Sequence, residues 1–190
     1  MACSINSTIS NGGSKDLLIT EKTTQYFLDE KISNEDINAI VNAGINATSA
    51  MNKQGWHFSV VTNKELLNKM KEKMQENMPL EMKNQPNAKA QLGDSPLAII
   101  VSCVEKGEYD AGLASQNMFN YAILSGYSAK IVSSPTRVIN ENFKSKLNIP
   151  NDMNAVAVVL IGKVKDMTGV DGVTQATTRK AVDEIAAFIK

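Results

Sequence analysis

A helical pattern is joined to a strand pattern by the stretch Ala47-Thr48-Ser49-Ala50-Met51-Asn52-Lys53-Gln54-Gly55-Trp56. Three uncharged hydrogen-bonding side chains lie in it, those of Ser49, Asn52 and Gln54. Asn and Gln each present a donor and an acceptor on one planar group, which suits a heterocycle with alternating carbonyl and N–H groups. We name residues 47–55 the ring loop, because the pattern predicts that they bind a polar, uncharged ring rather than a metal ion.

Regular elements are predicted on both sides of the ring loop. Ser33 can cap a helix over residues 34–46, whose apolar positions recur with helical spacing. After the loop, residues 56–60 alternate between apolar and polar side chains, which indicates a half-buried strand. Thr62 and Glu65 then have the spacing of a capping box for a second helix.

The rest of the chain also mixes helical and strand patterns. Residues 76–94 contain prolines and asparagines that break any period, so we expect a loop or a short irregular helix, mobile near the site entrance. Strands and helices alternate too irregularly for a doubly wound parallel sheet, and the pattern favours an α+β fold with helices around a sheet. The remaining predicted elements are strands over 97–104, 129–132 and 155–161, a helix over 110–124, a helix beginning at Ser134-Pro135, and a closing helix over 179–189.

Size and charge limit the possible classes of protein. The 190 residues, 43% of them hydrophobic, are enough for one substantial core. Twenty basic and twenty acidic residues give a formal net charge of zero, so no electrostatic surface for nucleic acid is indicated. The longest apolar runs are only strand-sized, and no transmembrane segment is predicted. We expect one domain over residues 16–190, preceded by a flexible segment over residues 1–15.

The two cysteines, Cys3 and Cys103, are too few for a disulfide framework or a zinc site. Cys103 lies in a buried strand pattern, where it is expected to act as a small hydrophobic residue. Cys3 precedes a Ser/Asn/Gly-rich run over residues 5–14, which resembles the start of a processed bacterial lipoprotein; a disordered N-terminus is the other interpretation. We expect a cytoplasmic protein, with an extracytoplasmic lipoprotein anchored through Cys3 as the alternative.

The ring loop resembles the flavin-binding loop of the nitroreductase family, usually Ala-Pro-Ser-x-x-Asn-x-Gln-Pro-Trp. Thr48 and Gly55 stand where that family usually has prolines, and this difference reduces rigidity without removing a polar contact. Further similarities extend over nearly the whole chain from about residue 20. They are residues 27–33 before the first long helix, 110–117 in the central helix, 160–162 in the last core strand, and the basic pair 179–180.

This resemblance implies an intertwined homodimer with a central, mainly antiparallel sheet wrapped by helices. It implies FMN at the subunit interface, NADH or NADPH as the hydride donor, and a nitroaromatic, quinone or similar small molecule as the acceptor. Ser49, Asn52 and Gln54 would lie near the isoalloxazine ring. Ser133 and Ser134 match the stretch whose backbone approaches the flavin N5, although a plain helix cap is an equally good interpretation.

The phosphate site is where the chain departs most from the family. The family usually has Arg-x-Ser-x-Arg before the position of Phe27, and Glu21 and Gln25 replace the two basic residues here. Donors remain in that segment, and a basic pair near the C-terminus can supply charge. With the family resemblance, the predicted phosphate contacts are Lys22, Thr23, Gln25, Arg179 and Lys180. A solvated helix start is the other interpretation of the basic pair 179–180.

Two rival functions remain open from the sequence. No catalytic side chain is predicted, because a flavin would carry the redox chemistry while the protein binds and orients it. The loss of the basic pair motivates the first rival, a flavin-binding protein of the same fold with little or no turnover. The second is a hydrolase using His57, the one histidine, which would have to lie in a cleft.

Overall fold

Four strands form one antiparallel sheet at the centre of the structure, a computed structural model that describes residues 27–83, 91–164 and 180–189. The spatial order is β1-β2-β4-β3, and each neighbouring pair is antiparallel. β2 and β4 are therefore central, and β1 and β3 are the two edge strands. The bounds are Trp56–Val61 for β1, Leu97–Val104 for β2, Ser128–Val132 for β3 and Met153–Gly162 for β4. The predicted α+β fold with an antiparallel sheet is confirmed.

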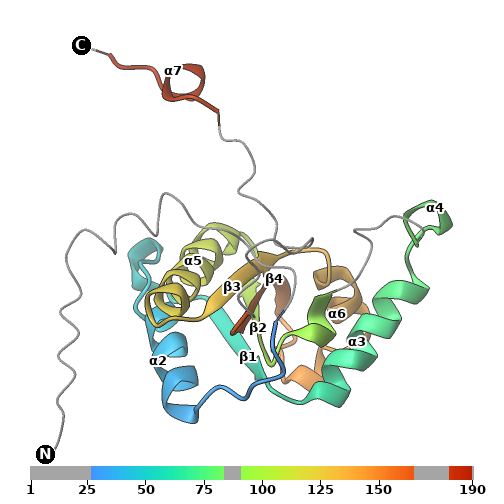
Figure 1. Cartoon of the computed structure of the whole chain (residues 1–190). Helices are drawn as coiled ribbons and strands as arrows, with labels where there is room; N and C mark the ends of the chain where they lie inside the picture. The colour runs from blue at the N-terminus through green and yellow to red at the C-terminus, as the bar shows by residue number, and fades with distance from the viewer. Residues whose placement is uncertain (1–26, 84–90, 165–179, 190) are drawn as a thin grey trace, which may run out of the picture.

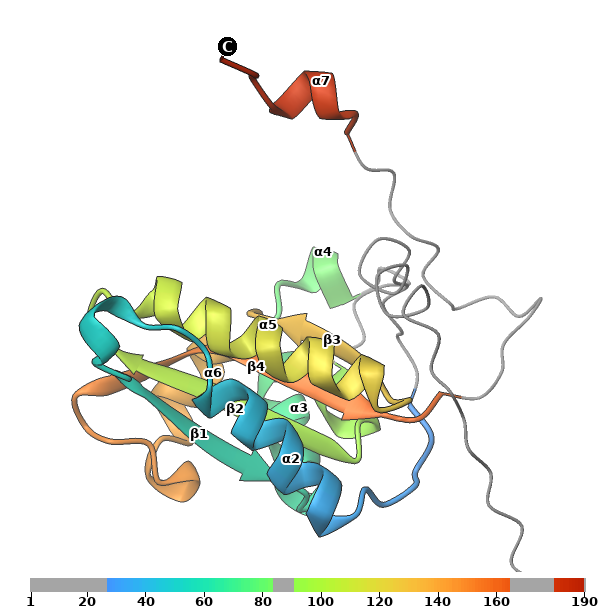
Figure 2. The same cartoon turned by 90° about the vertical axis from the view of Figure 1, so that its left-hand side faces the viewer.

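Helices cover both faces of the sheet (Figure 1). On one face, α2 (Asn34–Ile45) and α5 (Glu108–Leu124) lie side by side (Figure 2). On the other face lie α3 (Lys64–Glu76) and α6 (Thr136–Asn142). The alternation of side chains along β2 divides the core between these layers: Ala98 and Ile100 pack with α3 and α6, and Ile99, Val101 and Cys103 pack with α2 and α5.

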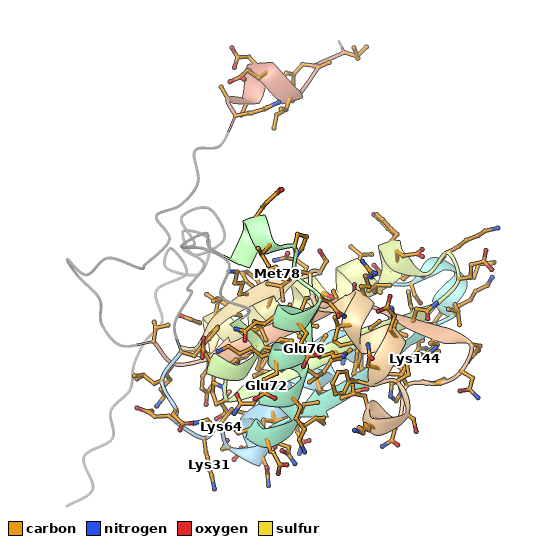
Figure 3. The ribbon with its side chains drawn as sticks, turned by 90° about the vertical axis from the view of Figure 1, so that its right-hand side faces the viewer. Lys31, Lys64, Glu72, Glu76, Met78 and Lys144 are labelled. Carbon is orange, nitrogen blue, oxygen red and sulfur yellow. The ribbon has the colours of Figure 1, made fainter. Side chains whose placement is uncertain are left out.

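The helix α3 shows how composition selects one buried face. Leu67 and Met70 are fully buried against the sheet. Figure 3 shows Lys64, Glu72 and Glu76 along the helix, and all three are exposed. Apolar side chains three to four residues apart thus face the core while charged ones face solvent.

The predicted helix starts were partly right. The α2 cap is confirmed, because Ser33 Oγ accepts a hydrogen bond of 3.0 Å from the Asp36 N–H. The predicted capping box of Thr62 and Glu65 was wrong: Asn63 caps α3, and its side chain accepts from the Leu66 N–H at 3.0 Å. A cap lies directly before the first helical residue, and β1 continues through Val61, so Thr62 comes one position too early.

Two further elements differ from their predictions. α6 begins at Thr136 with Pro135 in the N-cap position, and no side chain caps it, so the plain-cap interpretation of Ser133 and Ser134 was wrong. The closing helix predicted over 179–189 was wrong in length, since the structure has only α7, Val182–Ile185. The reason is that helices this short need tertiary packing, and every residue from 180 to 189 is exposed in the single chain.

Shorter elements complete the described chain. The stretch predicted as irregular contains α4 (Leu80–Lys83) and the 3-10 turn η2 (Gln91–Asp94), with residues 84–90 outside the description. Two more 3-10 turns are η1 (Ala50–Asn52) and η3 (Ser145–Leu147). None of the helices in the described ranges is long and apolar enough to cross a membrane. Cys3 and the predicted 1–15 segment lie outside the described residues.

Residues 27–33, which we name the strap, run from beside the end of β4 to the start of α2. The Leu28 N–H donates to the Lys163 carbonyl at 2.7 Å, so the strap begins beside the last residues of the sheet. Gly162 permits this close approach. A Cβ atom there would lie 2.8 Å from both Phe27 Cδ1 and Pro96 Cδ, closer than carbon atoms pack.

Candidate functional site

The ring loop has an unusual backbone. Met51, Asn52 and Gln54 have φ angles of 52°, 54° and 49°, in the left-handed region that non-glycine residues rarely adopt. Each such residue costs on the order of 1–3 kcal/mol and persists only where its surroundings enforce it. Asn accepts this conformation more easily than most residues do, because its short polar side chain bonds locally. Such strain clusters at functional sites, so the geometry directs attention to this loop.

Hydrogen bonds bring the three predicted ring-binding residues together. Ser49 Oγ accepts from the Gln54 N–H at 3.0 Å, and the Asn52 N–H donates to the Ser49 carbonyl at 3.0 Å. The side-chain amide of Gln54 donates to Asn52 Oδ1 at 3.1 Å. Asn52 and Gln54 are exposed and Ser49 is half-buried. The loop therefore presents two linked planar amides at the surface, supported from beneath by a hydroxyl.

Two contacts from segments distant in the sequence hold the ring loop in place. The Gly55 carbonyl accepts from the Val104 N–H at 3.1 Å, which joins the loop to the end of β2. The Ala50 N–H donates to Asp110 Oδ2 at 3.1 Å, which joins it to the first turn of α5. Sequence reasoning missed Asp110 as a site residue. Its only signal was an acidic residue near a helix start, and helix capping alone explains that signal.

Ser133 and Ser134 follow the last residue of β3, and both are exposed. The Ser133 carbonyl accepts from the Thr136 N–H at 3.0 Å and from Thr136 Oγ1 at 2.8 Å. Among the described residues, no acceptor is found for the Ser134 N–H. This backbone donor therefore remains available to a ligand.

The ring loop and Ser133–Ser134 lie at opposite edges of the sheet in one chain. The loop leads into β1, and the two serines follow β3. With three strand spacings between them, the two edges are about 14 Å apart. Trp56 faces Cys103, which faces Asn154 at the start of β4, and β3 runs toward that same end. The two groups thus share one end of the sheet without meeting.

The predicted phosphate contacts are described only in part. Lys180 is exposed and lies just before α7. The other four, Lys22, Thr23, Gln25 and Arg179, lie outside the described residues. The proposed contribution of these residues to a phosphate site therefore stays a prediction.

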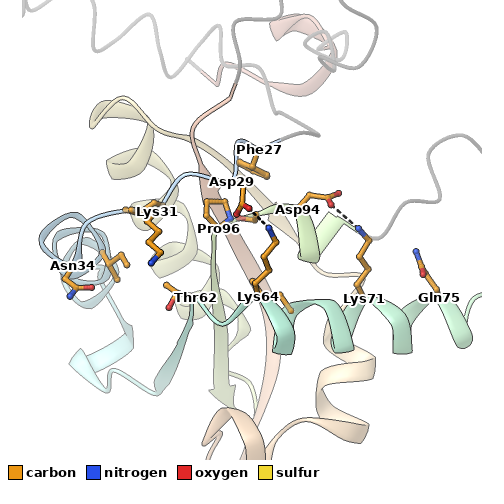
Figure 4. Close-up of a pocket in the computed structure, with 14 residues that line it drawn as sticks. Phe27, Asp29, Lys31, Asn34, Thr62, Lys64, Lys71, Gln75, Asp94 and Pro96 are labelled. Carbon is orange, nitrogen blue, oxygen red and sulfur yellow. Dashed lines mark hydrogen bonds and ion pairs between the residues drawn. The ribbon is translucent and has the colours of Figure 1, made fainter.

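A cavity of about 1020 Å³ lies at the other end of β1 from the ring loop. Its walls are the strap, α3 and η2, and Figure 4 shows Lys31, Lys64 and Lys71 directed toward it. Lys64 pairs with Asp29, and Lys71 Nζ lies 3.0 Å from Asp94 Oδ1. None of the predicted site residues that the structure describes lines this cavity. The lining residues are Phe27, Asp29, Lys31, Ile32, Asn34, Ile37, Thr62, Lys64, Leu67, Lys71, Gln75, Asp94, Ser95 and Pro96.

The geometry around His57 gives little support to the hydrolase. His57 faces Ser102 across the β1–β2 pair and does not line the cavity. Ser102 is completely buried, so a substrate cannot reach its hydroxyl. Cys103 is also buried, as predicted, and burial raises the pKa of its thiol, which keeps it protonated. No group of three or more possible metal ligands occurs among the described residues.

Comparison with known proteins identifies the family. A family model described as the nitroreductase family matches residues 21–163. A protein of Archaeoglobus fulgidus, provisionally named NADH dehydrogenase/NAD(P)H nitroreductase, is 31% identical, with 79% of this chain and 84% of the relative covered. The residues matched by the family model include the ring loop, the strap and the whole sheet.

Two solved nitroreductases with bound FMN have a similar fold. The one from Desulfitobacterium hafniense DCB-2 has a TM-score of 0.79 at 20% identity, and the one from Bacteroides fragilis NCTC 9343 has 0.78 at 19% identity. In both cases, 93% of this chain and 98% of the solved chain are covered. Because the family model covers most of the sequence and the fold agrees, the chain belongs to the nitroreductase family of oxidoreductases.

Proposed function

We propose that the chain is an FMN-dependent oxidoreductase that takes hydride from NADH or NADPH and reduces a nitroaromatic, a quinone or a similar small acceptor. The observation that carries this proposal is the ring loop. Its linked, exposed amides of Asn52 and Gln54, held in left-handed backbone, match the donors and acceptors of a flavin pyrimidine edge. The family and the FMN named in two solved structures of the same fold support this choice of ring.

The protein's own residues would divide the work as follows. Asn52 and Gln54 bind and orient the ring, and Ser49 holds the backbone of Gln54 in position. The Ser134 N–H, which has no acceptor among the residues that the structure describes, can stabilise negative charge on the reduced ring. Bound FMN supplies the hydride acceptance and donation that no side chain here provides.

We propose a homodimer that shares its flavin sites between chains. One chain places the ring loop and Ser133–Ser134 at opposite edges of its sheet, so a single flavin contacts both only if they come from two copies. Exposed apolar side chains near the C-terminus support this arrangement, because they have no partner in the described single chain. They are Val182 (63% exposed), Ile185 (69%), Phe188 (76%) and Ile189 (93%).

For the phosphate, we propose Lys22, Thr23 and Gln25 as donors, with Arg179 and Lys180 supplying most of the positive charge. A dianion needs such charge, and the usual basic pair is absent from residues 21–25. Residues 16–190 would act as one domain in this scheme.

A spectrum of the purified protein, followed by anaerobic titration with NADH and with NADPH, tests the proposed function. Flavin absorbance that bleaches with either nucleotide, and returns when a quinone is added, is the expected result. Flavin that never bleaches would favour the binding protein without turnover. A colourless protein that gains no absorbance after incubation with FMN and removal of excess would contradict both alternatives.

A further inference from the structure

Asp110 makes the one side-chain hydrogen bond from outside the ring loop to the loop within the described part of the chain. Its Oδ2 accepts from the Ala50 N–H at 3.1 Å, although 60 residues separate the two in sequence. All the other side-chain bonds described for the loop connect its own residues. The orientation of the loop relative to the protein body thus depends on this carboxylate, on the backbone bond to Val104 of β2 and on the local backbone bond from the Ala47 N–H to the Gly44 carbonyl of α2.

The position of this bond in the loop is significant. Ala50 is the first residue of η1, and the two left-handed residues Met51 and Asn52 follow it directly. The first N–H groups of a helical turn have no partner within the turn. Asp110 satisfies one of them and fixes the backbone immediately before the strained pair. A strained conformation persists only where its surroundings enforce it.

The helix that carries Asp110 is well suited to this task. The α5 helix has 17 residues, and its own side chains Ala111, Ala114 and Met118 are fully buried in the core. Asn117, seven residues after Asp110 and so on the same face, donates from Nδ2 to the Ala43 carbonyl at 3.3 Å. Ala43 belongs to the last turns of α2, which lead into the ring loop. The α5 helix therefore contacts both the end of α2, which leads into the ring loop, and the ring loop itself.

We propose that Asp110 is a positioning residue that keeps the ring loop in its ring-binding conformation through the Ala50 N–H. The inference about the loop stands on the geometry alone, while its effect on flavin rests on the proposed function. Asp110 acts on the backbone of the loop, and Asn52 and Gln54 would make the contacts to the ring.

Amide hydrogen exchange in the full-length protein, stripped of flavin, tests the first part. Asp110→Ala should accelerate exchange of the Ala50 amide about tenfold, because a charge-assisted hydrogen bond is lost. Asp110→Asn keeps an acceptor oxygen and should stay within about threefold of wild type. Glu108→Ala is the matched control: it removes an acidic residue from the same exposed helical turn, without a bond to the loop. It should leave the Ala50 amide unchanged.

FMN affinity, measured by fluorescence quenching on the same variants, tests the second part. We expect about a tenfold loss for Asp110→Ala, rescue to within about threefold by Asp110→Asn, and no loss for Glu108→Ala. A double-mutant cycle with Ala50→Pro removes the donor directly. Ser49 already has φ −139° and ψ 152°, the conformation that a residue before proline prefers. In the Ala50→Pro background, Asp110→Ala should have no further effect on affinity.

The outcomes separate this inference from the proposed function. Unchanged exchange and affinity in Asp110→Ala would overturn the inference, as would equal losses in Asp110→Ala and Glu108→Ala. The inference would also be overturned if Asp110→Ala lowered FMN affinity by the same factor in the Ala50→Pro background as in wild type. Asp110 would then act on the site without the Ala50 N–H. If wild type binds no FMN, the proposed function fails, and the exchange comparison still decides whether Asp110 positions the loop.

Discussion

At the scale of single residues, Asn52 combines a left-handed backbone with an exposed side-chain amide. We predict that Asn52→Ala lowers FMN affinity roughly fivefold to hundredfold, because a ring heteroatom loses its partner at a cost of about 1–3 kcal/mol. Asn52→Gly separates strain from bonding, since glycine accepts φ 54° freely but also lacks the amide. Both variants should lose affinity in a fluorescence titration. Full affinity in Asn52→Gly would show that the amide does not bind the ring.

A second residue-scale prediction concerns Tyr127, whose hydroxyl donates to Asp36 Oδ2 at 2.7 Å. Burial, and then the hydrogen bond to Asp36, raise the pKa of Tyr127 to about 12 from an ordinary value of 10.0. A raised folded-state pKa stabilises the protein below pH 10.0, and that stabilisation is lost as the pH rises through about 12.

Wild type should be more stable than Tyr127→Phe at neutral pH, because the variant lacks the hydrogen bond to Asp36, and the difference should shrink steeply above the ordinary pKa of tyrosine. Urea unfolding of both proteins between about pH 8 and pH 12 measures it. The same comparison at acidic pH tests Asp36, the partner of Tyr127. Hydrogen bonds from Ser33 first and Tyr127 second lower the pKa of Asp36, so the stability that the Asp36 carboxylate contributes is lost only as the pH falls below 3.8. A stability difference that does not change with alkaline pH would contradict this assignment.

At the scale of elements, the contact between the strap and the end of β4 requires a glycine at position 162, because a side chain there would fill the space between them. We predict that Gly162→Ala destabilises the protein by roughly 1–3 kcal/mol, because the new methyl group would collide with the rings of Phe27 and Pro96. Denaturant unfolding gives the value. Lys163→Ala is the control one residue later, since it removes only an exposed pair with Glu30 and should cost less than about 1 kcal/mol. Similar losses in both variants would show that the strap is not packed as described.

The sequence predicted some elements well because their signals are local. α2 and the strands β1 and β2 were placed to within one residue, since a few neighbouring apolar residues define each period. α7 was predicted too long for the opposite reason: an apolar stripe has the right spacing there, but its side chains pack against no other element in the described part of the single chain. The cap at Asn63 was missed because Thr62 carries an equally good local signal.

The ring loop residues Ser49, Asn52 and Gln54 are joined by hydrogen bonds, and their contact with a ring stays a prediction. Two features of the site were beyond sequence reasoning. The bond from Asp110 to Ala50 joins distant segments, and no periodic pattern marks such a contact. The separation of Ser133–Ser134 from the loop depends on β2 and β4 lying between β1 and β3. Strand order follows from the packing of the whole sheet, and no short motif encodes it.

At the scale of the whole molecule, the exposed apolar C-terminal residues predict association. We expect sedimentation at micromolar concentration to give twice the chain mass of 20.6 kDa, because burying such surface favours a symmetric dimer. Ile185→Lys should shift the protein toward monomer and reduce its flavin content together. Asp183→Lys, on the same short helix, introduces the same side chain without removing an apolar one and should remain dimeric. A wild-type monomer with stoichiometric FMN would contradict the shared site.

If the proposed dimer shares its flavin sites, the opposite sheet edges would allow two damaged chains to repair each other. An Asn52→Ala chain keeps its Ser133–Ser134 segment, and a Ser134→Pro chain, which lacks the backbone donor, keeps its ring loop. A mixed dimer of the two would hold one site with both defects and one site with none. Random refolding of equal amounts should then restore about a quarter of all sites, although neither parent has an intact one. Each half of the site could thus be scored separately, as in intragenic complementation.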